Sequence, residues 1–378
     1  MTGIAEDALD RLRSRIGVVR TPNPNRWNRA ATADAIRHWA WGVGDDNPLW
    51  ADGEYARSVG YEDVIAPPTF LYTTLYGPLG PTKAPSRGTG LPGLHVLHAG
   101  DAWEFFKPVA AGEPVDVEIM LEAVNELPSS YAGTTIEQVI LNRFIDRNGE
   151  LLAQYRLYRR SYERGSAKSE NKWADIQPWV YSDADILDIA SRYEAEKPRG
   201  TKSLAWDAVV VGEEIPPRTK GPLTSTSMVT YLGGWGAYFT MTDRIAHEYM
   251  RLHPGAIAMD AQHNVRDLPE RAHWDQDFAR EIGFPMGYDI GTQRISWYSH
   301  LLTDWIGDRG RVLQLSVKLR EPLWMWDLTT LHGRVTSAEI GAEGPTVALE
   351  LWGETQRGRR HSEGTAVVVL GDVEIGKA

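Results

Sequence analysis

The sequence contains no cysteine among its 378 residues, which excludes disulfides, thiol nucleophiles and thiolate metal sites. It also lacks any apolar run of about 18 residues, the length that a membrane-spanning helix requires. Residues 1–20 carry charges throughout and have no apolar core segment, so they predict a short amphipathic helix and not a secretory signal. These absences favour a cytoplasmic enzyme.

An excess of positive charge is absent as well. The chain has 51 acidic and 40 basic residues and a net charge of −11. A general nucleic-acid binder needs a basic surface, so this class is disfavoured. A local group of Arg and Lys could still hold a ligand that carries phosphate.

Metal-binding and phosphate-binding motifs are missing too. The spacing of His247, His253 and His263 does not match a zinc site, and we predict no metal and no cofactor. The glycine-rich stretch at 77–93 lacks the G-K-[ST] ending of a phosphate-binding loop. We interpret it as a mobile flap.

The chain repeats itself, and a repeat determines the architecture. "HWDQDFAREIGF" at 273–284 aligns with "WADGEYARSVGY" at 50–61 in one constant register. A second pair follows, because the stretch at 105–124 resembles the stretch at 318–337. In each, a strand runs into a proline, turns near an acidic residue and leaves as an alternating strand.

Each copy adds one helical stretch and further alternating strands. The helices are predicted at 68–80 and 291–307, and the strands at 134–149, 150–163, 346–360 and 363–373. A helix wrapped by a curved antiparallel sheet is the hotdog arrangement. The predicted class is therefore α+β, a double hotdog. Its parts are a first half at 1–163, a polar connector with a helical middle at 164–203, and a second half at 204–378.

Two stretches of half one carry a family resemblance. "GDDNPLW" at 44–50 and "IAPPTF" at 65–70 resemble the MaoC-like dehydratases, also called the (R)-specific enoyl-CoA hydratase family. Half two resembles a MaoC domain through "HWDQDFAREIGF" and "YDIGTQRISW" at 288–297. The resemblance implies a hydro-lyase that acts on an acyl-CoA thioester, as a homodimer or higher homo-oligomer. In such proteins an Asp and a His hold the water, and a backbone N–H binds the thioester oxygen.

The two halves differ where that chemistry would lie. The family histidine is Trp50 in half one, and the repeat alignment places His273 opposite Trp50. An indole N–H cannot accept a proton, whereas an imidazole can give and take one. Likewise Pro68, which has no N–H, lies opposite Gly291. We therefore predict that half two is catalytic and that half one shapes the acyl tunnel. The alternative for His273 is a buried structural histidine.

The pattern leaves two candidates for the carboxylate partner of His273. The family aspartate position is Leu268 here, and a bulge could bring Asp267 into place. Asp289 is the other candidate, with a helix N-cap as its alternative role. Asp275 more simply anchors a turn, because its partner Asp52 persists in half one. Asp45 is interpreted as a retained structural residue, in a capping role.

Aromatic residues suggest how a substrate would be held. The chain has 15 tryptophans, which serve either core packing or the lining of a pocket for a bulky acyl group. Candidate substrate-binding residues are Trp50, Tyr288, Arg294 and Trp297. A thioesterase, an inactive acyl-binding subunit and a hydro-lyase on a substrate without CoA remain as alternative functions.

Overall fold

The protein is described by a computed structural model. The described residues are 6–22, 25–77, 91, 94–129, 133–163, 173, 175–236, 240–254, 257–260, 262–341 and 344–371. Nearly all of the predicted flap at 77–93, and the first part of the connector at 164–172, lie outside these residues.

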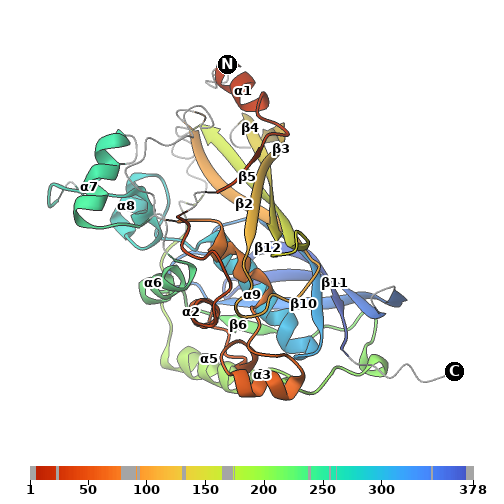
Figure 1. Cartoon of the computed structure of the whole chain (residues 1–378). Coiled ribbons are helices and arrows are strands. Elements are labelled where there is room, and N and C mark those ends of the chain that lie inside the picture. The colour runs from red at the N-terminus through yellow and green to blue at the C-terminus, as the bar shows by residue number, and fades with distance from the viewer. Residues whose placement is uncertain are drawn as a thin grey trace.

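One antiparallel sheet organises the chain (Figure 1). It has ten strands in the order β1-β3-β4-β5-β2-β9-β12-β11-β10-β6. Half one contributes the first five and half two the last five. The bounds are β1 Val19–Arg20, β2 Leu94–Phe105, β3 Asp116–Ser129, β4 Gly133–Ile145, β5 Leu151–Glu163, β6 Arg218–Lys220, β9 Arg311–Leu319, β10 Thr329–Gly341, β11 Gly344–Thr355 and β12 Arg360–Val369. A separate hairpin pairs β7, Ala258–Asp260, with β8, Val265–Asp267.

The two halves have the same strand order when each is read outward from the centre of the sheet. β2 and β9 join the halves through five residue pairs, from Gly100↔Lys318 to Glu104↔Gln314. On each side of that junction the last strand of the half comes next, followed by the strand before it in sequence. This arrangement confirms the predicted double hotdog class.

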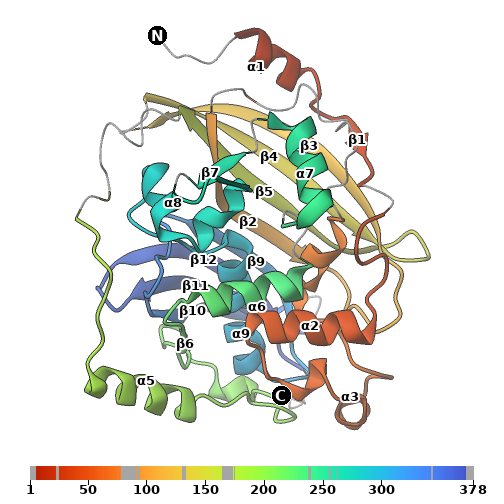
Figure 2. The ribbon, with the colours of Figure 1, turned by 90° about the vertical axis from the view of Figure 1, so that its left-hand side faces the viewer.

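Helices pack against the sheet and against one another (Figure 2). Their bounds are α1 Glu6–Arg13, α2 Ala33–Val43, α3 Gly53–Val59, α5 Asp183–Ala195, α6 Ser225–Trp235, α7 Asp243–Leu252, α8 Gln276–Glu281 and α9 Gly291–Ile306. Short 3₁₀ helices are η1 Pro48–Trp50, η2 Pro68–Thr74, η3 Trp206–Ala208 and η5 Pro269–His273. Among the described helices none is both long and apolar enough to cross a bilayer.

The long hotdog helix is present in half two. Every residue of α9 after Gly291 is buried. In half one the described counterpart is η2, a 3₁₀ helix that begins at Pro68 and ends at Thr74. The β-branched residues Thr69, Thr73 and Thr74 disfavour a long α-helix there. The predicted helix of half one is therefore shorter and tighter than its sequence suggested.

Local contacts repeat as the sequence alignment predicts. Asp52 caps α3 by accepting from the backbone N–H groups of Glu54 and Tyr55. Asp275 caps α8 in the same way, through Asp277 and Phe278. The prediction that Asp275 anchors a turn is thus confirmed in its geometry.

Two glycines let α2 and α6 approach closely. A Cβ on Gly42 would lie 3.0 Å from the Cα of Gly234, and a Cβ on Gly234 would lie 2.5 Å from the carbonyl oxygen of His38. Both clashes involve backbone atoms, which cannot rotate away. The contact between these helices therefore requires glycine at both positions.

This contact gives the first prediction. Gly234→Ala should lower the free energy of unfolding by about 1–3 kcal/mol, because the added methyl group overpacks the α2–α6 contact. Gly233→Ala is the matched control, since a Cβ at Gly233 meets nothing within 4 Å. The control should be neutral or stabilising by about 0.5–1 kcal/mol. Denaturant unfolding measures both, and equal effects of the two variants would contradict the close approach.

Candidate active site

A cavity of about 830 Å³ opens at the N-terminus of α9. Both halves line it, because β2 and β5 form one wall while η5 and the start of α9 form another. The residues that line it include Tyr72, His98, Tyr155, Trp173, Trp235, Glu270, His273, Tyr288, Asp289, Gly291 and Arg294. The structure therefore brings His273, Tyr288, Asp289, Gly291 and Arg294 together, as the sequence predicts.

His273 ends η5 and is fixed by its neighbour in space. Its Nδ1 lies 2.8 Å from the carbonyl oxygen of Tyr288, and the two rings are 4.5 Å apart between centroids. A carbonyl can only accept, so Nδ1 carries the proton and the neutral ring keeps a lone pair on Nε2. Burial lowers the pKa of His273, while the bond to Tyr288 opposes that shift. The ring is therefore held neutral and able to accept a proton.

Gly291 is the first residue of α9. Its N–H has no acceptor within the helix, and no side chain caps this terminus, whose N-cap residue is Ile290. A Cβ at Gly291 would lie 2.5 Å from Nδ1 of His98 and 2.8 Å from Leu319. Close packing thus demands glycine here, and the helix dipole favours a negative charge at the same point.

Asp289 and Arg294 form a buried ion pair beside that terminus. Arg294 donates to the carboxylate through Nη2 at 2.5 Å and Nε at 2.7 Å, and the N–H of Leu323 donates to it at 2.9 Å. Arg294 also donates to the carbonyl of Glu321. Asp289 is therefore not the N-cap of α9, and its oxygens are already occupied. Both residues hold the α9 terminus against the segment that follows β9.

Asp267 lies elsewhere. It ends β8 in the exposed hairpin, where its side chain is 53% exposed and accepts from the N–H of Leu268. The pairing of β7 with β8 is continuous and has no bulge to redirect it. Asp267 is not among the residues that line the cavity. The structure does not bring Asp267 to His273.

Glu270 is a carboxylate that sequence reasoning missed. It lies on η5 and lines the cavity with His273. Burial raises the pKa of its carboxyl group, and the charge of Asp267 adds to that shift. The repeat alignment would have flagged it, because Glu270 lies opposite Asn47 of the family motif.

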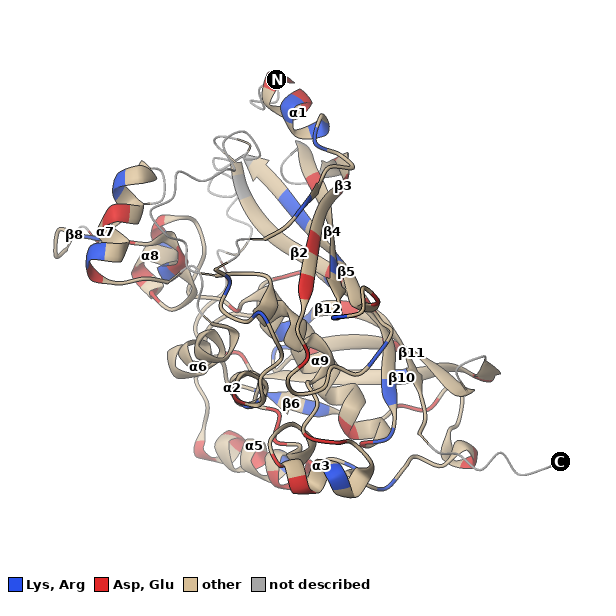
Figure 3. Cartoon of the chain, in the orientation of Figure 1, with Lys and Arg blue, Asp and Glu red and all other residues tan. Residues whose placement is uncertain are grey.

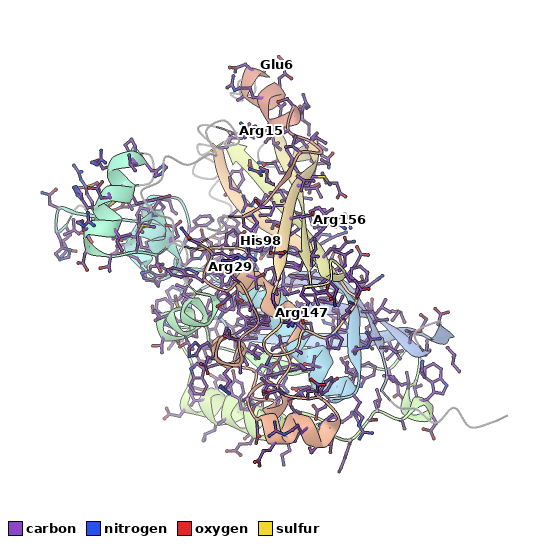
Figure 4. All side chains as sticks on the ribbon, in the orientation of Figure 1. Glu6, Arg15, Arg29, His98, Arg147 and Arg156 are labelled. Carbon is purple, nitrogen blue, oxygen red and sulfur yellow. The ribbon has the colours of Figure 1, made fainter. Side chains whose placement is uncertain are left out.

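His98 is the second missed residue (Figure 4). It lies on β2, and its Nε2 is 2.8 Å from Oδ1 of the fully buried Asp101. Asp101 also accepts from the hydroxyl of Tyr72, which in turn accepts from the indole N–H of Trp103 at 2.9 Å. No sequence motif marks this hydrogen-bonded series, which joins η2 to β2 within half one.

The remaining predicted binding residues lie outside this cavity. Trp297 is 4% exposed and packs in the core on α9. Trp50 lines a different pocket of only about 60 Å³ together with Pro68, at the position that the repeat relates to the main cavity. Other tryptophans, Trp173 and Trp235, line the main cavity, whereas Trp297 packs in the core.

Asp45 and Asn47 have structural partners in half two. Asn47 caps η1 and donates from Nδ2 to Asp308 at 2.8 Å. Asp45 accepts from the N–H of Asn47 and lies 3.5 Å from Nε2 of His300, near the C-terminal end of α9. These contacts explain why half one keeps both residues without the histidine.

Asp45 belongs to a buried charged cluster with His300, Asp304, Lys220 and Arg218. Lys220 donates to the carbonyls of Val43 and Gly44 and contacts Nδ1 of His300 at 2.8 Å. Arg218 pairs with Asp304, and both bases come from β6, which carries blue in Figure 3. Burial raises the pKa of Asp45 and lowers the pKa of Lys220.

Asp45, His300 and Asp304 bring potential metal ligands within 4.8 Å of one another. Their hydrogen bonding disfavours a metal. When Lys220 donates to Nδ1, the neutral ring of His300 carries its proton on Nε2, the atom that faces both carboxylates. The two nearby cations add electrostatic repulsion. The cluster is better described as an ion network that joins half one to α9.

Comparisons with known proteins agree with this fold. The pattern that defines the FAS1-like dehydratase domain region matches residues 21–155. A solved MaoC-like dehydratase superposes with a TM-score of 0.65 at 19% identity, covering 96% of this chain and 100% of that one. A Mycobacterium tuberculosis protein described as having a double hotdog fold gives 0.55 at 12% identity, covering 94% and 96%. The chain belongs to the MaoC-like dehydratase family.

Two curated relatives extend the comparison. A UPF0336 protein of Parafrankia sp. is 36% identical over 120 residues, which are 32% of this chain and 75% of the relative. A Thermomonospora curvata protein, named "probable enoyl-CoA hydratase alpha subunit", is 27% identical over 208 residues. That match covers 51% of this chain and 63% of the relative.

The ion network gives the second prediction. Lys220→Met should lower the free energy of unfolding by about 3–5 kcal/mol, because Asp45 would keep a buried charge without its cation. Adding Asp45→Asn should restore part of the loss, so the double variant should be more stable than the sum of the single effects. Lys202→Met, at an exposed lysine, is the control. Strictly additive effects in denaturant unfolding would refute the coupling.

Proposed function

We propose that this protein is a hydro-lyase that adds water across the 2,3 double bond of an enoyl-CoA thioester, or removes it from the 3-hydroxyacyl thioester. The observation that carries the proposal is the placement of His273 in the same cavity as the N-terminus of α9. One group can take a proton from water, and the other can hold negative charge on an oxygen. Addition of water to a conjugated thioester needs both functions.

His273 would be the base. Because Nδ1 is held by the carbonyl of Tyr288, Nε2 accepts a proton from water as the water oxygen attacks the β-carbon. The electron pair of the double bond then moves towards the thioester carbonyl. Burial supports this role, because it keeps the imidazole in its neutral, proton-accepting form.

Gly291 would stabilise the enolate oxygen. Its N–H begins a 16-residue helix, and the aligned peptide dipoles favour an oxyanion at that point. An oxyanion donor of this kind contributes on the order of 10²–10³ in rate. Pro68, at the related position of half one, has no N–H to offer, and its pocket of about 60 Å³ is far smaller than the main cavity.

The cavity suits an acyl chain. Its volume of about 830 Å³ lies within the range of ligand pockets, roughly 300–1,000 Å³. Aromatic and aliphatic side chains from both halves form most of its walls. The enoyl-CoA hydratase name of the Thermomonospora curvata relative supports CoA as the carrier.

His273 gives the third prediction. His273→Ala should reduce kcat/KM for hydration of short- and medium-chain trans-2-enoyl-CoA by at least about 10²-fold and leave the fold intact. His263→Ala, at an exposed hairpin histidine, is the matched control and should keep full activity. Loss of the conjugated enoyl absorbance measures turnover. Release of free CoA with the double bond retained would instead identify a thioesterase, and no turnover at all an acyl-binding subunit.

The lowered pKa of His273 gives the fourth prediction. The base must be neutral, so kcat/KM for hydration should fall as the pH drops through the pKa of this imidazole. Because burial lowers that pKa from its usual value of 6.5, the acidic limb should lie below pH 6.5. A pH–rate profile measures the acidic limb. An acidic limb with its midpoint above pH 6.5 would contradict a buried, neutral base.

A further inference from the structure

η5 places two titratable groups on one side. It runs from Pro269 to His273 as a 3₁₀ helix, in which residues three apart eclipse one another. Glu270 and His273 are three apart, and both line the cavity at the N-terminus of α9. The backbone geometry therefore directs a carboxyl group and an imidazole into one space.

Arg271, which follows Glu270, does not line the cavity. Arg271 lies 2.5 Å from a carboxylate oxygen of Asp275, 3.3 Å from Asp260 and 4.0 Å from Asp267. Arg271 thus pairs with carboxylates of the β7–β8 hairpin and of the α8 cap. Glu270 makes no salt bridge within the described part of the chain, so its carboxyl group remains available to the cavity.

Burial acts in opposite directions on the two groups. It raises the pKa of Glu270, which favours the protonated acid. It lowers the pKa of His273, which favours the neutral base. A carboxylic acid beside a neutral imidazole is the pairing that an addition of water needs, with one donor and one acceptor.

We propose that Glu270 is the catalytic acid that delivers a proton to the α-carbon of the substrate, opposite His273 as the base. This inference rests on the proposed hydro-lyase function and deepens it. Glu270 aligns with Asn47 of half one. It does not occupy the position of the family aspartate, which is Leu268 in this chain.

The step balances as follows. The O–H bond of water breaks, its proton goes to Nε2 of His273, and its oxygen bonds to the β-carbon. The π electrons form an enolate, whose oxygen accepts from the N–H of Gly291. The enolate α-carbon then takes the carboxyl proton of Glu270, leaving a carboxylate beside an imidazolium. Proton transfer from His273 to Glu270 restores both groups, and no other reactant is needed.

Neither carboxylate predicted from the sequence fits this role as well. Asp289 already accepts three hydrogen bonds, from Arg294 and from the N–H of Leu323. Asp267 lies on the exposed hairpin and is drawn towards Arg271. Glu270 combines access to the cavity with partial burial.

Glu270→Gln gives the fifth prediction and tests the assignment in the full-length protein. It should reduce kcat for hydration of trans-2-enoyl-CoA by at least about 10²-fold, because an amide cannot donate its proton to carbon. Glu270→Asp should retain more activity than the amide. Glu281→Gln, at an exposed carboxylate of α8, removes the same charge and should match the wild type. A large loss in Asp267→Asn together with an active Glu270→Gln would overturn the assignment.

The pH profile separates an acid from a structural residue. Glu270 must be protonated, so wild-type kcat/KM should fall as the pH rises through its pKa, which lies above 4.5. The residual activity of Glu270→Gln should lose this alkaline limb while keeping the acidic limb of His273. A Glu270→Gln profile with both limbs unchanged would overturn the proposal.

A second measurement does not depend on turnover. An ionised Glu270 stabilises a protonated His273, so Glu270→Gln should lower the pKa of His273 measured by NMR, whereas Glu281→Gln should not. An unchanged pKa would show that the groups do not share a site and would overturn the proposal. If the wild type hydrates enoyl-CoA and Glu270→Gln does so equally well, this inference fails alone. If the wild type hydrates no enoyl-CoA of any chain length, the proposed function fails and the proton-donor role fails with it.

Discussion

The buried helix α9 is the constraint on which the rest of the structure depends. A helix that is buried along its whole length must find partners for its polar side chains inside the protein. Near its start, Arg294 pairs with Asp289. Near its end, His300 and Asp304 meet Lys220 and Arg218 from β6. Half one contributes Asp45 to that second cluster, so the two halves are joined by charge as well as by the β2–β9 pairing.

The same constraint explains the asymmetry of the repeat. In half one, Asn47 of the motif joins η1 to Asp308 by a hydrogen bond, and Trp50 lines a small pocket. In half two the related positions carry Glu270 and His273, and a large cavity lies in front of them. Half one thus has an amide and an indole, which do not titrate, at the two positions where half two has titratable groups. Half one nevertheless supplies the wall with His98 and Tyr155, and the cavity would not exist without it.

The sequence predicted the elements that depend on local pattern. The repeat, the α+β double hotdog class and the capping role of Asp275 follow from spacing and from one constant register. The grouping of His273 with Gly291 follows from the same register. The carboxylate that we propose, Glu270, could not be predicted so directly, because the family position leads to Leu268 and its neighbour Asp267 belongs to an exposed hairpin. His98 carries no motif, and it reaches the site only through the pairing of β2 with β9.

Gly291 shows why the helix terminus and the cavity wall have to be considered together. Its missing side chain admits His98 of half one to within contact distance, and its position at the first turn leaves a backbone N–H without a helical acceptor. Any larger residue would displace His98, whose Nε2 is hydrogen-bonded to Asp101. The close approach of the two halves and the backbone donor at the helix terminus therefore both require a small residue with an N–H at position 291. This is a physical reason for half two to keep glycine where half one tolerates Pro68.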